Sequence, residues 1–277
     1  MAGRLMFPPD AVIRRVNAEP ALLFGAGRAL LLQLAHPAVA QGVHDHSEFK
    51  RNPFARLQGT LEAVNAMVFG SEELAERVGR RVRWIHDFVT GRGYAANDPV
   101  NLLWVHATLL DTALRCYEEL VGPLSAEEAE TYYSEMMRVA LGFGLALEDQ
   151  PPTLAAFRDY FEETVASIEV TDVGRDLASF IADPTLPLNL HVPLRPVLRT
   201  QRLFSVGTLP PSLREQLDFE WTELDQRRLE RTTRRVRGVF RRTPAALRTA
   251  PTRLNGIQLL WMAERHAAQF EAKRAAA

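Results

Sequence analysis

The chain has 277 residues, of which 47% are hydrophobic, so it has enough apolar side chains for a large core. Its 33 lysines and arginines nearly balance its 34 acidic residues, which argues against a basic surface for nucleic acid. With Cys116 as its single cysteine, the chain can form neither an internal disulfide nor a thiolate metal cluster. The polar start of the chain and its short apolar runs predict no signal peptide and no membrane span, so we expect a cytoplasmic protein.

Helical periodicity runs through almost the whole chain, and prolines and capping residues mark where the helices begin. The predicted helices, in chain order, cover residues 20–34, 37–43, 54–69, 71–90, 98–120, 125–147, 153–168, 170–183, 198–204, 212–217, 221–242 and 255–273. Residues 184–196 hold four prolines and are predicted to be the least regular stretch. No repeat or linker divides the chain, so we predict an all-α fold with a single globular helical domain over residues 1–277.

The helix predicted over residues 98–120 carries a histidine on its apolar stripe. Steps of three and four residues place on one face Leu102, His106, Leu109, Ala113, Tyr117 and Leu120. A buried imidazole without a partner costs about 1–3 kcal/mol, so His106 should either be hydrogen-bonded or ligate a metal. Periodicity alone favours a hydrogen-bonded core histidine, while an axial haem ligand on a helix is also compatible with it.

Three further histidines, His36, His44 and His46, lie within eleven residues. Together with Asp45 and Glu48 they suggest an iron or zinc site. Their spacing argues against that site, because His44 and His46 diverge by about 200° on a helix and neither has a histidine four residues away. We therefore expect these rings to lie in a loop and to cap backbone groups, and we predict no separate metal there.

Arg56 and Thr60 are four residues apart and share a helix face, so they can offer a guanidinium and a hydroxyl to one ligand. The alternative is an arginine paired with an acidic neighbour and a threonine bonded to a backbone carbonyl. The segment Gly25–Ala29 is rich in small residues but follows no strand, so we expect it to allow close approach of a helix or a flat ligand. Residues 227–242 are rich in arginine, which is typical of a solvated helix face, with a phosphate, propionate or membrane-surface contact as the alternative.

Several motifs occur in an order that is typical of one family. In the first half of the chain they are Gly27-Arg28-Ala29 with Gln33, Ala35-His36-Pro37, His46-Ser47-x-Phe49, Pro53, Arg56-x-x-x-Thr60 and Phe69-Gly70. In the second half they are Trp104-Val105-His106-Ala107-Thr108-Leu109, Tyr132-Tyr133-x-Glu135 and Pro151-x-Thr153. Over residues 17–221 the chain resembles the MpaB-like oxygenase family, which shares its catalytic domain with the latex clearing protein, a rubber oxygenase. Residues 222–273 would then form an Arg-rich helix and a terminal helix outside the family-like region.

The resemblance implies a globin-like core that holds haem b and its iron. It implies that His106 is the proximal axial ligand, and that Arg56 and Thr60 lie near the haem with Arg56 on the distal side. Two departures from the rubber oxygenases stand out. Gly59 occupies the position of a lysine that can cap the iron there, and Leu110 and Asp111 occupy the positions of a basic pair. Self-ligation by that lysine is therefore not available here, and the different surroundings of the axial histidine argue against polyisoprene as the substrate.

The first hypothesis is a haem b-dependent oxygenase that acts with O₂ or peroxide on a small apolar molecule, an isoprenoid by family analogy. Arg56 would stabilise developing negative charge, Thr60 would orient a water or an oxygen, and His46 would donate a proton. The alternative is a non-catalytic haem-binding sensor, carrier or scavenger that uses the same His106. A third hypothesis is a cofactor-free interaction protein in which His106 is a core residue.

Overall fold

The computed structural model describes residues 4–46, 53–183 and 188–276, apart from the side chains of residues 53–57, 188–194, 196 and 197. In these ranges the chain is all-α, as its periodicity predicts. The helices are α1 (Val12–Asn17), α2 (Ala21–Ala35), α3 (Pro37–His46), α4 (Pro53–Phe69), α5 (Glu72–Asp87), α6 (Pro99–Leu120), α7 (Ala126–Gly142), α8 (Leu154–Ser167), α9 (Asp172–Ala182), α10 (Leu188–Gly207), α11 (Pro211–Gln216), α12 (Glu223–Arg242) and α13 (Ala245–Ala275), with a 3₁₀ turn at Leu147–Asp149.

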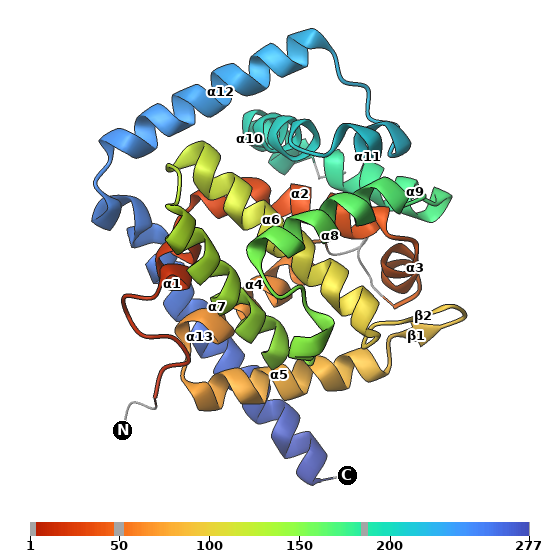
Figure 1. Cartoon of the computed structure of the whole chain (residues 1–277), viewed down its shortest axis with the longest axis vertical. Coiled ribbons are helices and arrows are strands. Elements are labelled where there is room, and N and C mark those ends of the chain that lie inside the picture. The colour runs from red at the N-terminus through yellow and green to blue at the C-terminus, as the bar shows by residue number, and fades with distance from the viewer. Residues whose placement is uncertain (1–3, 47–52, 184–187, 277) are drawn as a thin grey trace.

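Helix α6 passes through the middle of the molecule (Figure 1). Helix α2 packs along it and also contacts α10, α9 and α3, while α7 packs on α6, α1 and α4. The two C-terminal helices are added around this group: α12 packs on α10 and α6, and α13 packs on α4 and α5. Figure 1 shows α12 across the upper edge of the molecule and α13 running down to the C-terminus at the opposite edge.

Side-chain caps explain why several helices begin where the sequence predicts. Ser71 Oγ accepts a hydrogen bond from the backbone N–H of Leu74 at the start of α5, at 3.2 Å. Ser125 and Glu128 form the predicted capping box of α7, in which each side chain accepts from the other residue's backbone N–H. Such caps satisfy N–H groups that the first turn leaves without partners, so the predicted starts of these helices are confirmed.

Two predicted helix starts are wrong by ten residues, both beside prolines. Helix α10 begins at Leu188 and continues through Pro193 and Pro196, where the sequence predicted an irregular stretch. Helix α13 begins at Ala245 and contains Pro251, whereas the predicted helix began after this proline, at residue 255. A proline inside a helix costs about 3 kcal/mol, and packing of α10 on α2 and of α13 on α4 offsets that cost.

A small hairpin also escaped prediction. Strand β1 (Thr90–Gly91) pairs antiparallel with β2 (Tyr94–Ala95) just after α5. The turn between them needs the left-handed backbone of Gly93, whose φ is 86°. Sequence analysis ended a helix at residue 90 and predicted no strand after it, because two-residue strands are too short to show a period-2 pattern.

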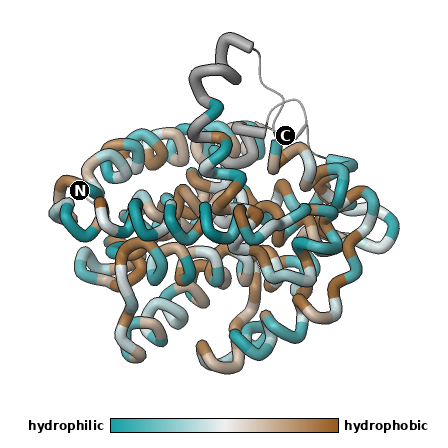
Figure 2. The backbone as a smooth tube through the Cα atoms, turned by 90° about the horizontal axis from the view of Figure 1, so that it is seen from above, coloured by the Kyte–Doolittle hydropathy of each residue, from teal (hydrophilic) through white to brown (hydrophobic). Residues whose placement is uncertain are grey.

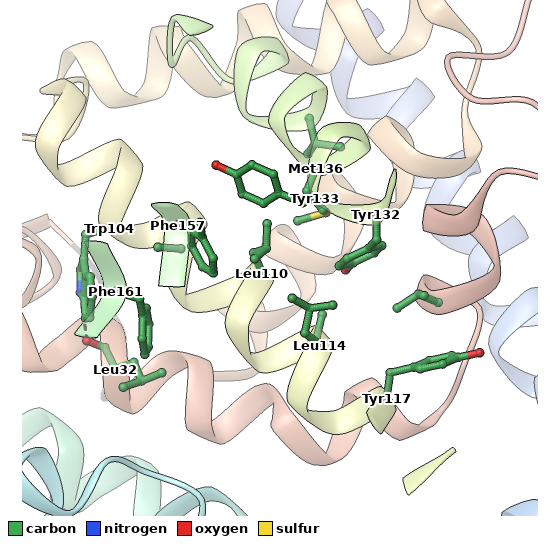
Figure 3. Close-up of a cluster of buried hydrophobic side chains, with 14 of the residues drawn as sticks. Leu32, Trp104, Leu110, Leu114, Tyr117, Tyr132, Tyr133, Met136, Phe157 and Phe161 are labelled. Atoms are coloured by element: carbon green, nitrogen blue, oxygen red, sulfur yellow. Dashed lines mark hydrogen bonds between the residues drawn. The ribbon is translucent and has the colours of Figure 1, made fainter. Parts of the chain in front are cut away.

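The hydrophobic core surrounds α6 (Figure 3). Trp104 donates from its indole Nε1 to the backbone oxygen of Leu32 on α2, at 3.1 Å, and its ring stacks on Phe161 of α8 with centroids 5.6 Å apart. On the α7 side, Leu110 and Tyr132 are fully buried. These contacts join helices from distant parts of the chain and fix the position of α6.

Apolar and polar residues alternate along most helices (Figure 2), as expected for amphipathic helices around a core. Among the described residues, no single helix combines the length and the apolar composition needed to cross a membrane. Within the same ranges, α2 and α3 taken together have that length and composition, but they are bent by 102° relative to each other.

Candidate functional site

Helix α6 positions the central candidate, His106. The carboxylate of Asp98 caps its first turn by accepting from the N–H of Val100 at 2.9 Å, and Pro99 occupies the first helical position. Both features match the predicted start of this helix. The helix is 22 residues long and has buried residues along its whole length, from Asn101 to Leu120. The side chains on its faces therefore have defined neighbours.

The face of α6 toward α2 carries a polar network centred on Arg28. This guanidinium is almost fully buried, and it donates to the backbone oxygen of Thr208 at 3.0 Å and to Thr112 Oγ1 at 2.7 Å. Its third nitrogen forms an ion pair with Asp111 at 2.6 Å. Burial lowers the pKa of Arg28, and the carboxylate of Asp111 opposes that shift. Two of the three nitrogens therefore donate hydrogen bonds and the third lies in an ion pair, which offsets the cost of burying the charge.

Other residues of α2 support the same contact. Gln33 donates to Thr108 Oγ1 at 3.2 Å, and Thr108 donates to the backbone oxygen of Val105 at 2.7 Å. A Cβ on Gly25 would overlap Thr112 and lie 2.5 Å from Cys116 Sγ, so only glycine allows this approach of the two helices. The small residues of this segment therefore admit another helix, which is one of the two outcomes predicted for Gly25–Ala29.

His106 lies on a different side of α6 and has no such partner. Its Nε2 atom is buried and accepts or donates no hydrogen bond within the described part of the chain. Burial lowers the pKa of His106 to about 4, so the ring is neutral at pH 7. A neutral imidazole with an unused buried nitrogen is the state in which histidine ligates a metal.

The predicted apolar stripe around His106 is covered unevenly. Its C-terminal part, at Ala113, Tyr117 and Leu120, is buried as predicted. Its N-terminal part, at Leu102, His106 and Leu109, is only half-buried. Around His106 the protein therefore covers the apolar stripe only in part, which leaves apolar surface for a ligand to contact.

The cluster His36, His44 and His46 does not share one environment. His36 follows the last residue of α2, and its half-buried ring lies 6.2 Å from that of Trp104. Its Nδ1 has no hydrogen bond among the described residues, and burial lowers its pKa. It is thus a second buried nitrogen without a partner, which sequence analysis did not separate from its neighbours.

His44 and His46 lie in the last turn of α3, because this helix continues three residues beyond its predicted end. The loop predicted for them is therefore wrong. His44 Nδ1 contacts Asp45, whose pKa falls to about 2 because it accepts hydrogen bonds from His44, Gln41 and Tyr94. His46 Nε2 lies 3.1 Å from the backbone oxygen of Thr90 and 3.0 Å from Tyr94 Oη, so it ties α3 to the hairpin. Within the described ranges, His, Cys, Asp and Glu side chains form no group of three or more that could hold a metal.

Arg56 and Thr60 both lie in α4, consistent with the predicted shared helix. The side chain of Arg56 falls outside the described residues, whereas Thr60 is half-buried. Among the described residues, no atom outside the neighbouring backbone of α4 lies within 4 Å of the position that a Cβ would take on Gly59, which is between them. The position that carries a lysine in the rubber oxygenases therefore has free space here.

Two motifs of the second half, Tyr132-Tyr133-x-Glu135 and Pro151-x-Thr153, make structural contacts. Glu135 of α7 accepts from the N–H of Ile13 at 2.7 Å, which caps α1, and Thr153 Oγ1 accepts from the N–H of Ala156, which caps α8. Tyr133 donates to the backbone oxygen of Pro151 at 2.5 Å. Burial raises the pKa of Tyr133 to about 12, with a smaller contribution from Glu130, so this hydroxyl stays protonated.

The comparison with known proteins agrees with the motif order. Residues 13–238 match the catalytic domain of the ER-bound oxygenase mpaB/B'/rubber oxygenase family. The chain belongs to this family. Uncharacterized proteins of Mycobacterium bovis and Mycobacterium tuberculosis are each 29% identical to it over 216 residues, which is 73% of this chain and 82% of theirs. No solved structure matches it.

The family match extends beyond the predicted region of 17–221 at both ends, and it includes α1 and most of α12. All the predicted site residues, His46, Arg56, Thr60 and His106, fall inside the mpaB/rubber oxygenase domain. Sequence analysis overlooked the burial of Arg28, for which one signal was available: it is the only charged residue in the apolar helix α2. The long helix α13 lies outside the match.

Proposed function

We propose that this protein is a haem b-dependent oxygenase of the mpaB/rubber oxygenase family that acts on a small apolar molecule, with an isoprenoid as the substrate class suggested by the family. The observation that carries the proposal is the buried, unpartnered and neutral Nε2 of His106. The free-energy cost of burying this nitrogen without a partner disappears when its lone pair binds a metal. The family supports oxygenase activity in general.

The residues of α6 fit a haem group. His106 would hold it as the single protein ligand, and the half-buried Leu102 and Leu109 on the same stripe would cover part of its apolar ring. Bound haem would supply the activation of O₂ that amino-acid side chains cannot perform. A globin-like haem core is part of this proposal.

The chain's own residues would bind and orient the reactants. Arg56, on α4, would place a positive guanidinium where negative charge develops on the oxygen reactant, and Thr60, one turn later, would hold a water or an oxygen by a hydrogen bond. His46 remains a predicted proton donor, and its contacts with Thr90 and Tyr94 fix the orientation of its ring. Apolar residues of the stripe would exclude water from the substrate.

The absorption spectrum of the purified full-length protein tests the proposal. Wild-type protein made with haem precursor should show a Soret band and about one haem per chain by the pyridine haemochrome assay. His106→Ala should lose both and keep its helical circular dichroism, because truncating one imidazole leaves a modest cavity. His36→Ala is the matched control, since it removes another buried histidine nitrogen without a partner, and it should keep its haem.

A His106→Ala protein with full haem content would show that His106 is not the ligand. If the protein binds haem through His106 but no apolar substrate increases its O₂ uptake, the non-catalytic haem-binding function is correct instead.

Arg56 is tested through the ferric protein and an anionic probe. Arg56→Leu should keep haem and weaken azide binding by about tenfold or more, because a charged hydrogen bond contributes about 1.5–3 kcal/mol. Once a substrate is known, turnover should fall by about 10²–10³. Arg56→Lys should recover only part of either, since lysine lacks the planar fork of donors. Unchanged azide affinity with a lower melting temperature would instead identify Arg56 as a structural ion-pair residue.

A further inference from the structure

Helix α13 has an apolar face that points away from the protein. It is 31 residues long, which corresponds to about 46 Å, and its buried residues Leu259, Ala263 and Ala267 face α4 and α5. The opposite face carries four large apolar side chains, each more than 60% exposed, at Leu247, Leu254, Ile257 and Trp261. We call these four residues the α13 stripe.

The α13 stripe is continuous along the helix. Its members are separated by seven, three and four residues, so they share one side of the helix over about 21 Å. Isolated exposed apolar residues are common on proteins, but a row of four on one helix face marks an interaction surface. The stripe belongs to a segment outside the family domain, which ends at residue 238, so the fold of that domain does not explain it.

Among the described residues, the unpaired charges around the stripe are positive. Both acidic residues of α13 are paired with arginines of α5: Glu264 pairs with Arg77, and Glu271 pairs with Arg77 and Arg80. Arg253 and Arg265 are exposed and form no ion pair among the described residues, and the Arg265 guanidinium lies over the Trp261 ring at 5.6 Å. Beside the apolar stripe, these two arginines therefore have no carboxylate partner in the described part of the chain, whereas both glutamates are already paired.

The same asymmetry holds over the whole C-terminal segment. Residues 223–275 contain 13 lysines and arginines and five acidic residues, whereas residues 1–222 contain 20 and 29. A chain with a net charge of −1 thus places a charge of +8 on its last two helices. Helix α13 itself carries +3 of this charge, from five cations and two acidic residues, and this attracts an anionic partner to the helix and repels a second copy of it.

We propose that the α13 stripe docks on the surface of an anionic lipid bilayer, with α13 lying in the plane of the interface. Leucine, isoleucine and tryptophan enter the boundary between headgroups and acyl chains, while Arg253 and Arg265 contact lipid phosphates. A nucleic acid would satisfy the cations but not the apolar row, and a second copy would satisfy the row but not the cations. This inference does not depend on haem or on turnover.

Vesicle sedimentation of the full-length protein tests the docking. We expect binding to vesicles of phosphatidylcholine with 30% phosphatidylglycerol, much weaker binding to phosphatidylcholine alone, and loss of binding at high salt because the attraction is screened. Leu254→Ser with Ile257→Ser should reduce binding at least tenfold without any change in charge. Arg253→Gln and Arg265→Gln should each reduce it about fivefold.

The matched control is Phe88→Ser with Val100→Ser, which removes two equally exposed apolar side chains that are not on α13. This variant should bind vesicles like the wild type, and all variants should keep the wild-type melting temperature because the substituted side chains are exposed. Light scattering of the same proteins tests whether a second copy of the chain covers the stripe instead.

If the wild type shows no affinity for anionic vesicles, or if Leu254→Ser with Ile257→Ser binds them as well as the wild type does, the proposal is wrong. It is equally wrong if the wild type is a dimer that this double substitution converts to a monomer, because the stripe would then cover a second copy.

Discussion

Two faces of α6 differ in whether the buried nitrogen atoms at them have polar partners among the described residues. On the face toward α2, Arg28 is among the largest fully buried side chains, and its guanidinium makes two hydrogen bonds and an ion pair. On the other, His106 buries one nitrogen that has no partner in the described part of the chain. Both residues belong to family motifs, so membership of a motif does not by itself distinguish a structural residue from a ligand-binding one. The residue proposed as a ligand is the one whose buried nitrogen has no partner among the described residues, whereas the structural one has its polar atoms paired.

The largest expected effect on stability concerns the face of α6 toward α2, where the Arg28 guanidinium has its polar partners. Arg28→Leu should lower the free energy of unfolding by about 3–5 kcal/mol, because it leaves Asp111, Thr112 and the Thr208 carbonyl without their donor. Urea unfolding of the cofactor-free protein at pH 7 measures this. The control is Arg115→Leu, which removes an exposed pair with Glu119 on the same helix and should cost about 1 kcal/mol or less. Equal costs for the two variants would contradict the structural role of the network.

The next effect concerns the face of α6 that carries His106, and it is a dependence of stability on pH. The pKa of His106 is about 4 in the folded protein against 6.5 in the unfolded chain, so the unfolded chain binds the extra proton as the pH falls from 6.5 to 4. The free energy of unfolding of the cofactor-free protein should fall across this window by up to about 3 kcal/mol on account of His106.

His106→Leu removes this titration, and it should flatten the same part of the pH profile without a large loss of stability at pH 7. Replacing an unpartnered polar group by an apolar one costs little, in contrast to the loss of Arg28. Unfolding curves measured at half-unit steps between pH 4 and pH 7 provide the test. An unchanged slope in His106→Leu would mean that the imidazole has a polar partner.

The smallest effect concerns how closely helices approach. Gly25→Ala should destabilise the protein by about 1–3 kcal/mol, because the new Cβ overlaps Thr112 and Cys116. Gly59→Ala is the matched substitution on α4, where the Cβ meets no atom within 4 Å, and it should stabilise the protein by about 0.5–1 kcal/mol through helix propensity. Melting temperatures of the two variants should therefore shift in opposite directions. A stabilised Gly25→Ala protein would show that α2 and α6 are less tightly packed than the structure indicates.

Much of the fold follows from local sequence. Helical periodicity predicted the all-α structure, and the caps at Ser71, Asp98 and Ser125 predicted where α5, α6 and α7 begin, because these signals act over three or four residues. The apolar stripe placed His106 on one face of α6 for the same reason. The order of the motifs identified the family, which the match over residues 13–238 confirms.

The remaining features depend on residues that are far apart in the chain. The acceptor of Arg28 at Thr208 is 180 residues away, and Gln33 meets Thr108 across 75 residues, so no local pattern could show that these side chains are satisfied. Only the packing of α10 on α2 and of α13 on α4 shows that both helices tolerate their prolines. The sequence determined which residues face the same side of each helix, since that is set by 3.6 residues per turn. The tertiary structure decided which of those residues find a partner, since hydrogen bonds and burial depend on helices brought together across the whole chain.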